Sequence, residues 1–320
     1  MDFIEEDKLV RGATTYYPLE LGWHLDRIDQ RYLPLDGRYQ PNHGYTGRGV
    51  DIYIMDSGVR YSHKVFGGRA RYGGYDAYGS NGEDCHGHGT HCAGLAGGKL
   101  TGAAYGANIY SLRVLNCQNG GSFSHILAAL NLVVEKARNS KRPTIVSMSL
   151  IGPKSDYVER ALKRAYENGV VAIAAAGNFR SDACDYHPAA SRYAITVGGT
   201  QEDGDHLYWF SSSSRSPGTN FGKCVDIFAP GQWIRSAGHQ CYDCLVSMSG
   251  TSMATPITAG VAALLLEEDP SLTPRGLRDR MRRRATSGVI DFSKMPSYAR
   301  SATSNLLVYV GIGEKSFHNL

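Results

Sequence analysis

The stretch "TIVSMSLIGPKSDYVERALKRAYENGVVAIAAAGN", residues 144–178, decides the fold class. It begins with a short apolar run, 144–150, and ends with another, 170–176, and both are rich in the branched side chains of buried strands. Between them the apolar residues of 156–169 recur at helical spacing, and Gly169 is a typical helix end. A strand, a helix and a second strand in succession predict a parallel strand pair joined by a crossover helix.

Similar segments alternate along the rest of the chain. Three more strands are predicted at "VDIYIMD" (50–56), "NIYSLRVL" (108–115) and "YAITVGG" (193–199), and two more helices at 124–139 and 252–268. Near-continuous apolar strands between helices indicate an α/β fold with a mostly parallel central sheet and helices on both faces. Residues 205–248 are more polar and are broken by Gly, Ser and Cys, which favours loops and antiparallel ribbons. No repeat or second core is visible, so we expect one domain.

Composition and charge are those of an ordinary globular protein. Of the 320 residues, 42 % are hydrophobic and 20 % are charged, and the net charge is +4. Because this balance is only mildly basic, we expect no nucleic-acid partner. No apolar run approaches the roughly 20 residues that cross a bilayer, so we expect no membrane span.

Much of the positive charge lies in "RGLRDRMRRRA", residues 275–285. Leu277, Met281 and Ala285 recur every four residues, which is the spacing of one helical face, and the arginines fall elsewhere. Thr273 can cap the start of this helix. A solvated helix surface is the simpler interpretation, and a patch for an acidic partner is the alternative.

The cysteines and the N-terminus give opposite indications about the compartment. Seven cysteines, with Cys241 and Cys244 close together, are typical of an exported protein in an oxidising environment. The opening "MDFIEEDKLVRG" (1–12) is acidic and lacks the apolar core of a signal peptide. The two observations agree if the sequence is a fragment or a processed form, and we favour a fragment. We therefore expect a secreted, extracellular protein.

Four chemically distinctive residues lie where predicted strands end or helices begin, the places where reactive groups gather in an open parallel sheet. They are Asp56 in "DSG", His88 in "HGHGTHCAG", Asn178 in "AAGN" and Ser252 in "SGTSMATP". A carboxylate, an imidazole, an amide and a hydroxyl are the parts that acyl transfer by a serine nucleophile requires. We expect His88 to take the proton of Ser252 during attack, with Asp56 orienting the imidazole. Asn178 is expected to donate to the developing oxyanion, beside the backbone N–H of Ser252.

The histidine-rich stretch "HGHGTHCAG", residues 86–94, admits other interpretations. A metal cluster is one, but the stretch lacks the acidic partner and the i, i+4 histidine spacing of a zinc hydrolase. His91 lies among small residues and fits a packed core histidine, and His86 fits a loop. No cofactor is therefore expected to be required for catalysis.

In this order and in these motifs, the four residues resemble those of the subtilisin-like serine proteases, peptidase family S8. "HGTHCAG" (88–94) and "SGTSMATP" (249–256) are specific signatures of that family, and "WHLDRID" (23–29) resembles the opening of its mature enzymes. The likeness runs from about Trp23 to Val310 and points to the proteinase K branch. It implies a subtilisin-like fold and a serine endopeptidase that cleaves protein or peptide substrates through an acyl-enzyme.

Four stretches narrow the resemblance. Within the branch, "SLRVLNCQ", "GNFRSDAC", "TNFGKCVDIFAPG" and "CYDC" look most like the catalytic domain of proprotein convertase subtilisin/kexin type 9. That likeness implies an alternative function, a self-processed protein of weak or no further protease activity that binds a receptor. The stretch "TSMATP" keeps the pattern of the active proteases and favours the enzyme.

The resemblance also implies a domain division. The three parts are an N-terminal extension or propeptide remnant at 1–22, the catalytic domain at 23–312 and a C-terminal tail at 313–320. The family's own propeptide acts as a folding aid and as an inhibitor, so we expect one as a partner. A monomer is the family expectation.

Three disulfides follow from the same resemblance. The implied pairs are Cys85–Cys117, Cys184–Cys224 and Cys241–Cys244. The first would tether the loop before His88, and the second would brace the segment after Asn178. Cys92 is then left over, and a buried free thiol is its expected state.

Family members bind peptide substrates as extra strands. The implied edge segments are "NGGS" (119–122) and "SLIG" (149–152), with contacts from Asn119, Gly121, Ser149, Leu150, Ile151 and Gly152. Ile151 replaces the family's usual glycine, which keeps the first pocket open. It is expected to narrow that pocket and favour small side chains, or to block it.

Structural calcium is a further implication. Asp226 matches an aspartate that binds a stabilising calcium ion in the proteinase K branch, together with two backbone carbonyls, which here belong to Arg192 and Ala194. One carboxylate and two carbonyls suit a hard cation whose shell water completes. A structural role for Asp226 at a strand end is the alternative.

Overall fold

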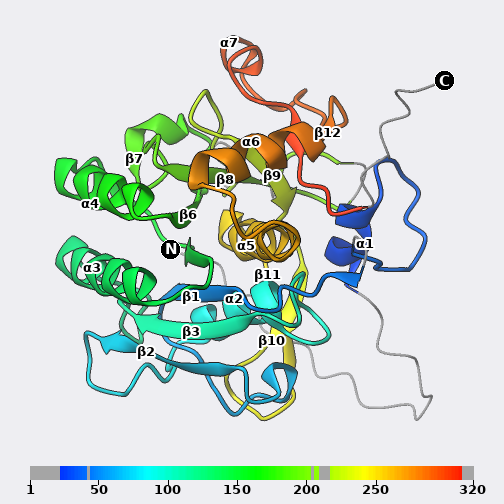
Figure 1. Ribbon diagram of the computed structural model, residues 1–320. Coiled ribbons are helices and arrows are strands. Elements are labelled where there is room, and N and C mark those ends of the chain that lie inside the picture. Colours follow the sequence, from blue (N-terminus) through cyan, green and yellow to red (C-terminus); the bar gives the residue numbers. More distant parts are fainter. Residues whose placement is uncertain (1–21, 42–43, 203–204, 209–216, 312–320) are drawn as a thin grey trace.

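The computed structural model describes residues 22–41, 44–202, 205–208 and 217–311 (Figure 1). The predicted extension and tail lie outside these residues, apart from Gly22. The strands of the central sheet are β1 Asp51–Asp56, β2 Ala70–Asp76, β3 Asn108–Arg113, β4 Thr144–Met148, β6 Val170–Ala175, β8 Ala194–Thr200, β9 Ile227–Pro230, β12 Thr286–Ser287 and β13 Leu306–Leu307. Their order is β12-β13-β9-β8-β6-β4-β1-β3-β2, and only the β12–β13 pair is antiparallel. The expected α/β fold with a mostly parallel sheet is thus confirmed.

Helices cover both faces of this sheet. They are α1 Trp23–Asp29, α2 His88–Gly97, α3 Phe123–Asn139, α4 Asp156–Glu167, α5 Thr251–Glu268, α6 Pro274–Arg284 and α7 Ser297–Arg300. Because strand side chains alternate, Ile52 and Ile54 of β1 pack in one core with α2 and α5, whereas Tyr53 and Met55 pack in the other with α3 and α4. Figure 1 shows α3 and α4 side by side and α5 near the middle of the fold.

Two elements depart from the sequence-based prediction. The edge strand β2 was not predicted, because its side chains are half exposed and its register shifts between Tyr72 and Tyr75. Within 205–248, β10 Ile234–Ala237 and β11 Leu245–Met248 form the expected antiparallel ribbon, but β9 joins the parallel sheet. A further pair of short antiparallel strands lies outside the central sheet, β5 Gly152–Pro153 and β7 Tyr186–His187.

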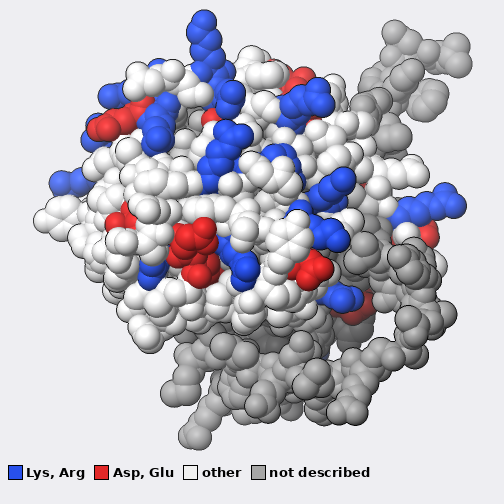
Figure 2. Space-filling view, turned by 90° about the horizontal axis from the view of Figure 1, so that it is seen from below, with Lys and Arg blue, Asp and Glu red and all other residues white. Residues whose placement is uncertain are grey.

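The arginines of α6 pair with acids of the same chain. The ion pairs are Arg275–Asp279, Arg278–Asp226, Arg282–Asp226, Arg280–Asp269 and Arg284–Glu268. The face seen in Figure 2 shows acidic side chains among the basic ones. Leu277 and Met281 are buried, as their spacing predicted. These intramolecular pairs favour the solvated helix over a patch for an acidic partner.

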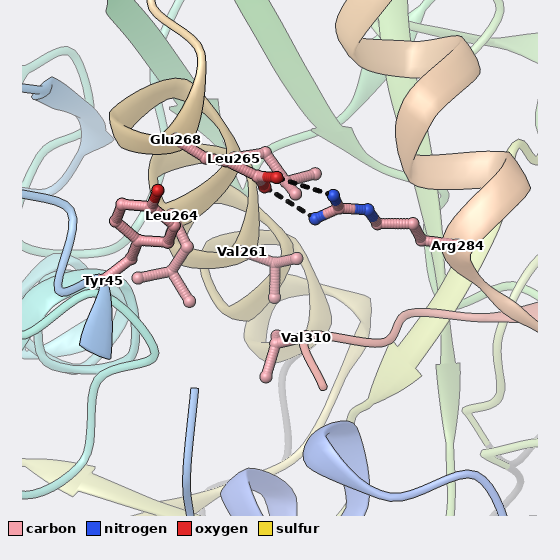
Figure 3. Close-up of a pocket in the computed structure, with 7 residues that line it drawn as sticks. All are labelled: Tyr45, Val261, Leu264, Leu265, Glu268, Arg284 and Val310. Atoms are coloured by element: carbon pink, nitrogen blue, oxygen red, sulfur yellow. Dashed lines mark hydrogen bonds and ion pairs between the residues drawn. The ribbon is translucent and has the colours of Figure 1, made fainter. Parts of the chain in front are cut away.

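Figure 3 shows one of these pairs at the junction of α5 and α6, where the Arg284 guanidinium makes two hydrogen bonds to the Glu268 carboxylate. The cavity that Val261 and Val310 line with them measures only about 10 Å³, which is room for at most one water molecule. This cavity is therefore not a ligand site. In the described part of the chain no helix combines the length and the apolar character that crossing a membrane needs.

Candidate active site

The carboxyl ends of three neighbouring strands, β1, β4 and β6, define the site. Asp56 is the last residue of β1, and Asn178 follows β6 closely. The Oδ1 atom of Asp56 accepts hydrogen bonds of 2.7 Å from His88 Nδ1 and from Ser57 N. Asp56 is 1 % exposed, so little water competes for its carboxylate. The predicted pairing of an acid with an imidazole is therefore present in the geometry.

His88 is the first residue of α2 and is buried, with 9 % of its surface exposed. Burial by itself lowers the pKa of His88, but the adjacent Asp56 carboxylate opposes this and the net pKa lies well above its usual value. The start of α2 is fixed by Asp84, whose carboxylate accepts hydrogen bonds from the Ser57 hydroxyl, the backbone of His86 and Gly87 and both donors of Thr90. An acid at a helix N-terminus also offsets the helix dipole there.

Ser252 lies in the first turn of α5, and its neighbours connect it to the histidine. Cys92, one turn after His88 in α2, has its Sγ 4.0 Å from His88 Nδ1 and 3.5 Å from Ser252 O. Ser252 Oγ donates a long bond, 3.4 Å, to the carbonyl of Ser149, whose own hydroxyl donates to Ser252 O at 2.7 Å. The helix starts of α2 and α5 therefore bring His88 and Ser252 to the same place.

Asn178 is held by the residue before the serine. Its Oδ1 accepts hydrogen bonds from Thr251 N at 2.9 Å and from Thr251 Oγ1 at 3.1 Å. Gly250 has φ 150°, and the point that a Cβ would occupy on it lies 3.3 Å from Asn178 Nδ2 and 3.6 Å from both Asn178 Oδ1 and Ser252 N. Because Oδ1 already accepts from Thr251, the groups left to donate here are Nδ2 and Ser252 N. Two donors thus flank one small space beside the serine, which is the arrangement that an oxyanion needs. Thr251 was not predicted as a site residue from the sequence, although it lies within the quoted motif "SGTSMATP".

The predicted substrate-binding segments lie around this space. Ser149 contacts Ser252 as described, and the side chain of Ile151 reaches Gly177, where an added Cβ would overlap its Cδ1. Gly152 begins β5 and packs against Phe123. The second segment is a turn closed by the Leu115–Gly121 bridge, with Asn119 at φ 59°. Leu150 is buried, so its side chain belongs to the core.

The cysteines pair as Cys85–Cys117, Cys184–Cys224 and Cys241–Cys244, and Cys92 is a buried free thiol. These are the pairs that the resemblance implied. Burial raises the pKa of the Cys92 thiol, so it stays protonated and unreactive at neutral pH. Asp56, His88 and Cys92 place their ligand atoms within 4.8 Å of one another. A metal ion there would have to break the Asp56–His88 hydrogen bond, which disfavours the metal interpretation.

The residues expected to bind calcium do not fit a calcium ion. Asp226 Oδ1 lies 3.9 Å from Arg278 Nε and 3.7 Å from Arg282 Nη1. Arg278 also donates to the carbonyl of Ala194, and Thr196 N donates to Asp226 Oδ2. The Asp226 carboxylate and the Ala194 carbonyl thus already interact with guanidinium groups. A divalent cation at these oxygens would be repelled by the two positive charges. The alternative, a structural aspartate, fits better.

Comparison with known proteins places this geometry in a family. The family model described as "Subtilase family" matches residues 47–308. The chain belongs to the subtilase family. This subtilase is 41 % identical over 309 residues to the extracellular serine proteinase of Thermus sp. (strain Rt41A), covering 96 % of this chain and 70 % of that protein. It is 40 % identical over 296 residues to alkaline serine exoprotease A of Vibrio alginolyticus, covering 91 % of this chain and 52 % of that protein.

Solved structures give the same result. A cold adapted subtilisin-like serine proteinase superposes with a TM-score of 0.80 at 40 % identity, covering 91 % of this chain and 98 % of that one. Sphericase superposes with a TM-score of 0.75 at 25 % identity, with the same coverage. The protein is therefore a subtilisin-like serine endopeptidase.

The finer resemblance to the type 9 convertase is not supported, since these matches are to extracellular and subtilisin-like proteinases. The physical reason is visible in the four stretches that suggested it. Each contains a disulfide cysteine: Cys117, Cys184, Cys224, or both Cys241 and Cys244. The similarity of those stretches therefore reflects the positions of disulfide bonds and gives little information about what the protein binds.

Proposed function

We propose that this subtilase is a secreted enzyme of the proteinase K branch that hydrolyses peptide bonds through an acyl-enzyme. In this mechanism Ser252, turned about χ1 toward His88, attacks the carbonyl carbon while His88 takes its proton. His88 then donates that proton to the leaving amine, and water releases the acyl group by the reverse sequence of proton transfers. Asp56 keeps Nδ1 protonated, so that Nε2 faces the serine as a base.

The proposal is carried by the space beside Gly250, where Asn178 Nδ2 and Ser252 N converge. Negative charge on the carbonyl oxygen of a tetrahedral intermediate would lie between these two donors. Because Thr251 holds the Oδ1 atom of Asn178, the amide is oriented before substrate arrives and needs no rearrangement during the reaction. Preorganised donors of this kind stabilise the transition state more than the substrate.

Labelling with a fluorophosphonate probe tests the nucleophile. We expect the folded, oxidised protein to be labelled and the Ser252→Ala variant to remain unlabelled. Ser247→Ala is the matched control, because it removes an exposed hydroxyl in the neighbouring strand β11 and should leave labelling intact. Absence of labelling in protein with native circular dichroism would contradict the proposal.

Ile151 is proposed to limit the pocket for the residue that precedes the cleaved bond. Its side chain reaches Gly177, the residue before Asn178, so it occupies space next to the reacting carbonyl. We expect the enzyme to prefer Ala over Phe at that position in peptide p-nitroanilides. Ile151→Gly should raise kcat/KM for Phe relative to Ala by roughly 10- to 100-fold, with Ile151→Val intermediate. An unchanged preference in Ile151→Gly would show that this side chain does not line the pocket.

Secretion and domain organisation complete the proposal. The extracellular Thermus relative and the three disulfides support an oxidising compartment outside the cell. Residues 23–312 are proposed as the catalytic domain, with residues 1–22 and 313–320 outside it, and a propeptide as folding aid and inhibitor. Limited proteolysis of the Ser252→Ala variant should leave a resistant fragment with these boundaries.

A further inference from the structure

A second segment, far along the chain, lies beside the loop that carries Asn178. Phe179 bridges Gly218 and Asp182 bridges Phe221, both in parallel register. Backbone hydrogen bonds follow these bridges, among them one of 3.3 Å from Gly218 N to Asn178 O. The backbone of the loop is therefore supported by residues 218–221. The Phe179 side chain is 57 % exposed and stacks on Tyr186, with ring centroids 5.2 Å apart.

The centre of this support is the side chain of Asn220, which is completely buried. Its Nδ2 donates to the carbonyl of Ala176 at 2.9 Å. Its Oδ1 accepts from Phe179 N at 2.9 Å and from Ser181 N at 3.1 Å. These partners precede and follow Asn178, so a single side chain brackets the backbone of that residue.

An amide side chain suits this set of bonds, because it carries a donor and an acceptor on separate atoms. The partner on one side is a carbonyl, which needs a donor, and the partners on the other side are N–H groups, which need an acceptor. Asn220 N also donates to Gly177 O at 2.8 Å, and the place of a Cβ on Gly177 is only 2.6 Å from Asn220 Nδ2. The packing is tight enough to transmit any change at residue 220 to the loop.

We propose that Asn220 is a positioning residue that sets the orientation of the Asn178 amide for the oxyanion. The inference rests on the proposed function, because it requires Asn178 to stabilise the oxyanion. Asn220 touches neither substrate nor the reacting atoms, and it acts through the backbone of residues 176–181. A shift of the loop moves Asn178 Nδ2 away from the space beside Gly250, where hydrogen bonding to the transition state depends on short distances.

A double-mutant cycle tests this role. The readout is kcat for a peptide p-nitroanilide, in which formation of the acyl-enzyme limits the rate, in four proteins: parent, Asn178→Ala, Asn220→Ala and the double variant. Loss of an oxyanion donor commonly lowers kcat by roughly 100- to 1,000-fold. We expect Asn220→Ala to lower kcat by roughly 10- to 100-fold with KM nearly unchanged, because the substrate contacts stay in place. In the Asn178→Ala background the same substitution should lower kcat by less than about threefold.

The inference would be overturned if Asn220→Ala lowered kcat by the same factor whether or not Asn178 is present. If Asn220→Ala only reduces the folded fraction, it lowers kcat by the same factor in both backgrounds, and Asn220 is then merely structural. Asn220→Ser, a smaller change, gives the same comparison if the alanine variant folds poorly. Asn305→Ala is the matched control, because Asn305 also bridges backbone groups, those of Ile290, at a site remote from the active site. If Asn178→Ala itself retains full kcat, the oxyanion role in the proposed function fails, which is distinguishable from failure of the inference alone.

Discussion

Asp56 affects His88 in two ways, through the tautomer of the imidazole and through its pKa. In Asp56→Asn the amide can donate to Nδ1 and leave the proton on Nε2, so we expect kcat to fall by about 10⁴-fold. Loss of the carboxylate also removes the charge that raises the pKa of His88 against the effect of burial. Because catalysis needs neutral His88, activity rises with pH through that pKa, and in the variant this rise should move to lower pH. The profile of kcat/KM against pH measures both effects, and an unmoved acid limb would contradict the assignment.

Some site residues could be predicted from the sequence, and others could be identified only in the structure. Asp56, His88 and Ser252 lie in short motifs, and the structure brings their segments together at one edge of the sheet. Thr251 and Asn220 are common residue types, and their hydrogen bonds join segments that lie far apart in the chain. Thr251 N donates to Asn178, and Asn220 Nδ2 donates to the carbonyl of Ala176. Both residues lie in quoted motifs, "SGTSMATP" and "TNFGKCVDIFAPG", but a motif does not show which distant group a side chain will contact. The folded structure is needed to identify these contacts.

The helix α6 is anchored on the sheet by cationic side chains at the place expected for calcium. Replacing Arg278 and Arg282 by methionine would leave the Asp226 carboxylate without its positive neighbours. We expect this double variant, made in the inactive Ser252→Ala protein, to lose about 1–3 kcal/mol of unfolding free energy. Added Ca²⁺ should raise the Tm of the variant, since the oxygens around Asp226 are then free for a cation. In the parent, where guanidinium groups lie beside these oxygens, Asp226 should give the Tm no dependence on Ca²⁺ or on a chelator.

Controls on the same helix make this result specific. Arg283 is exposed and makes no ion pair in the described part of the chain, so Arg283→Met should leave both the Tm and its calcium dependence unchanged. A parent protein that loses Tm on chelation, with the loss abolished by Asp226→Asn, would restore calcium to this site and refute its replacement by arginine.

The central strands of the sheet could be predicted because both of their faces are buried, which gives each of them a short apolar run in the sequence. β1, β3, β4, β6 and β8 were all predicted, because each carries a short apolar run and nearly every residue in them is buried. The strand β9 was missed because its four residues lie in a polar, Cys- and Gly-rich region and join the sheet only through β8 and β13. Short strands of this kind owe their pairing to tertiary neighbours rather than to local propensity.

Across the whole molecule, two buried histidines connect distant segments while they are neutral. His24 in α1 donates from Nε2 to Thr101 O, and His91 in α2 donates to the carbonyls of Ile234 and Val246 in the β10–β11 ribbon. Burial lowers the pKa of His24 to about 4 and that of His91 to about 3. Below pH 6.5 the unfolded chain binds protons at these histidines that the folded chain does not, so both oppose folding in acid.

The contribution of His24 can be isolated by His24→Gln, because the glutamine amide can keep a donor for Thr101 O but cannot take up a proton. Asp29 and His88 have raised pKa values and act in the opposite direction, so the slope of the parent alone is not diagnostic. Between pH 6.5 and about 4, the unfolding free energy of the parent should fall more steeply than that of the variant, by up to about 1.4 kcal/mol per pH unit. Urea unfolding of both proteins in the Ser252→Ala background measures this difference, and the value at pH 8 gives the loss of packing alone. Parallel stability curves from pH 8 to pH 4 would show that His24 takes up its proton in the folded protein as readily as in the unfolded chain.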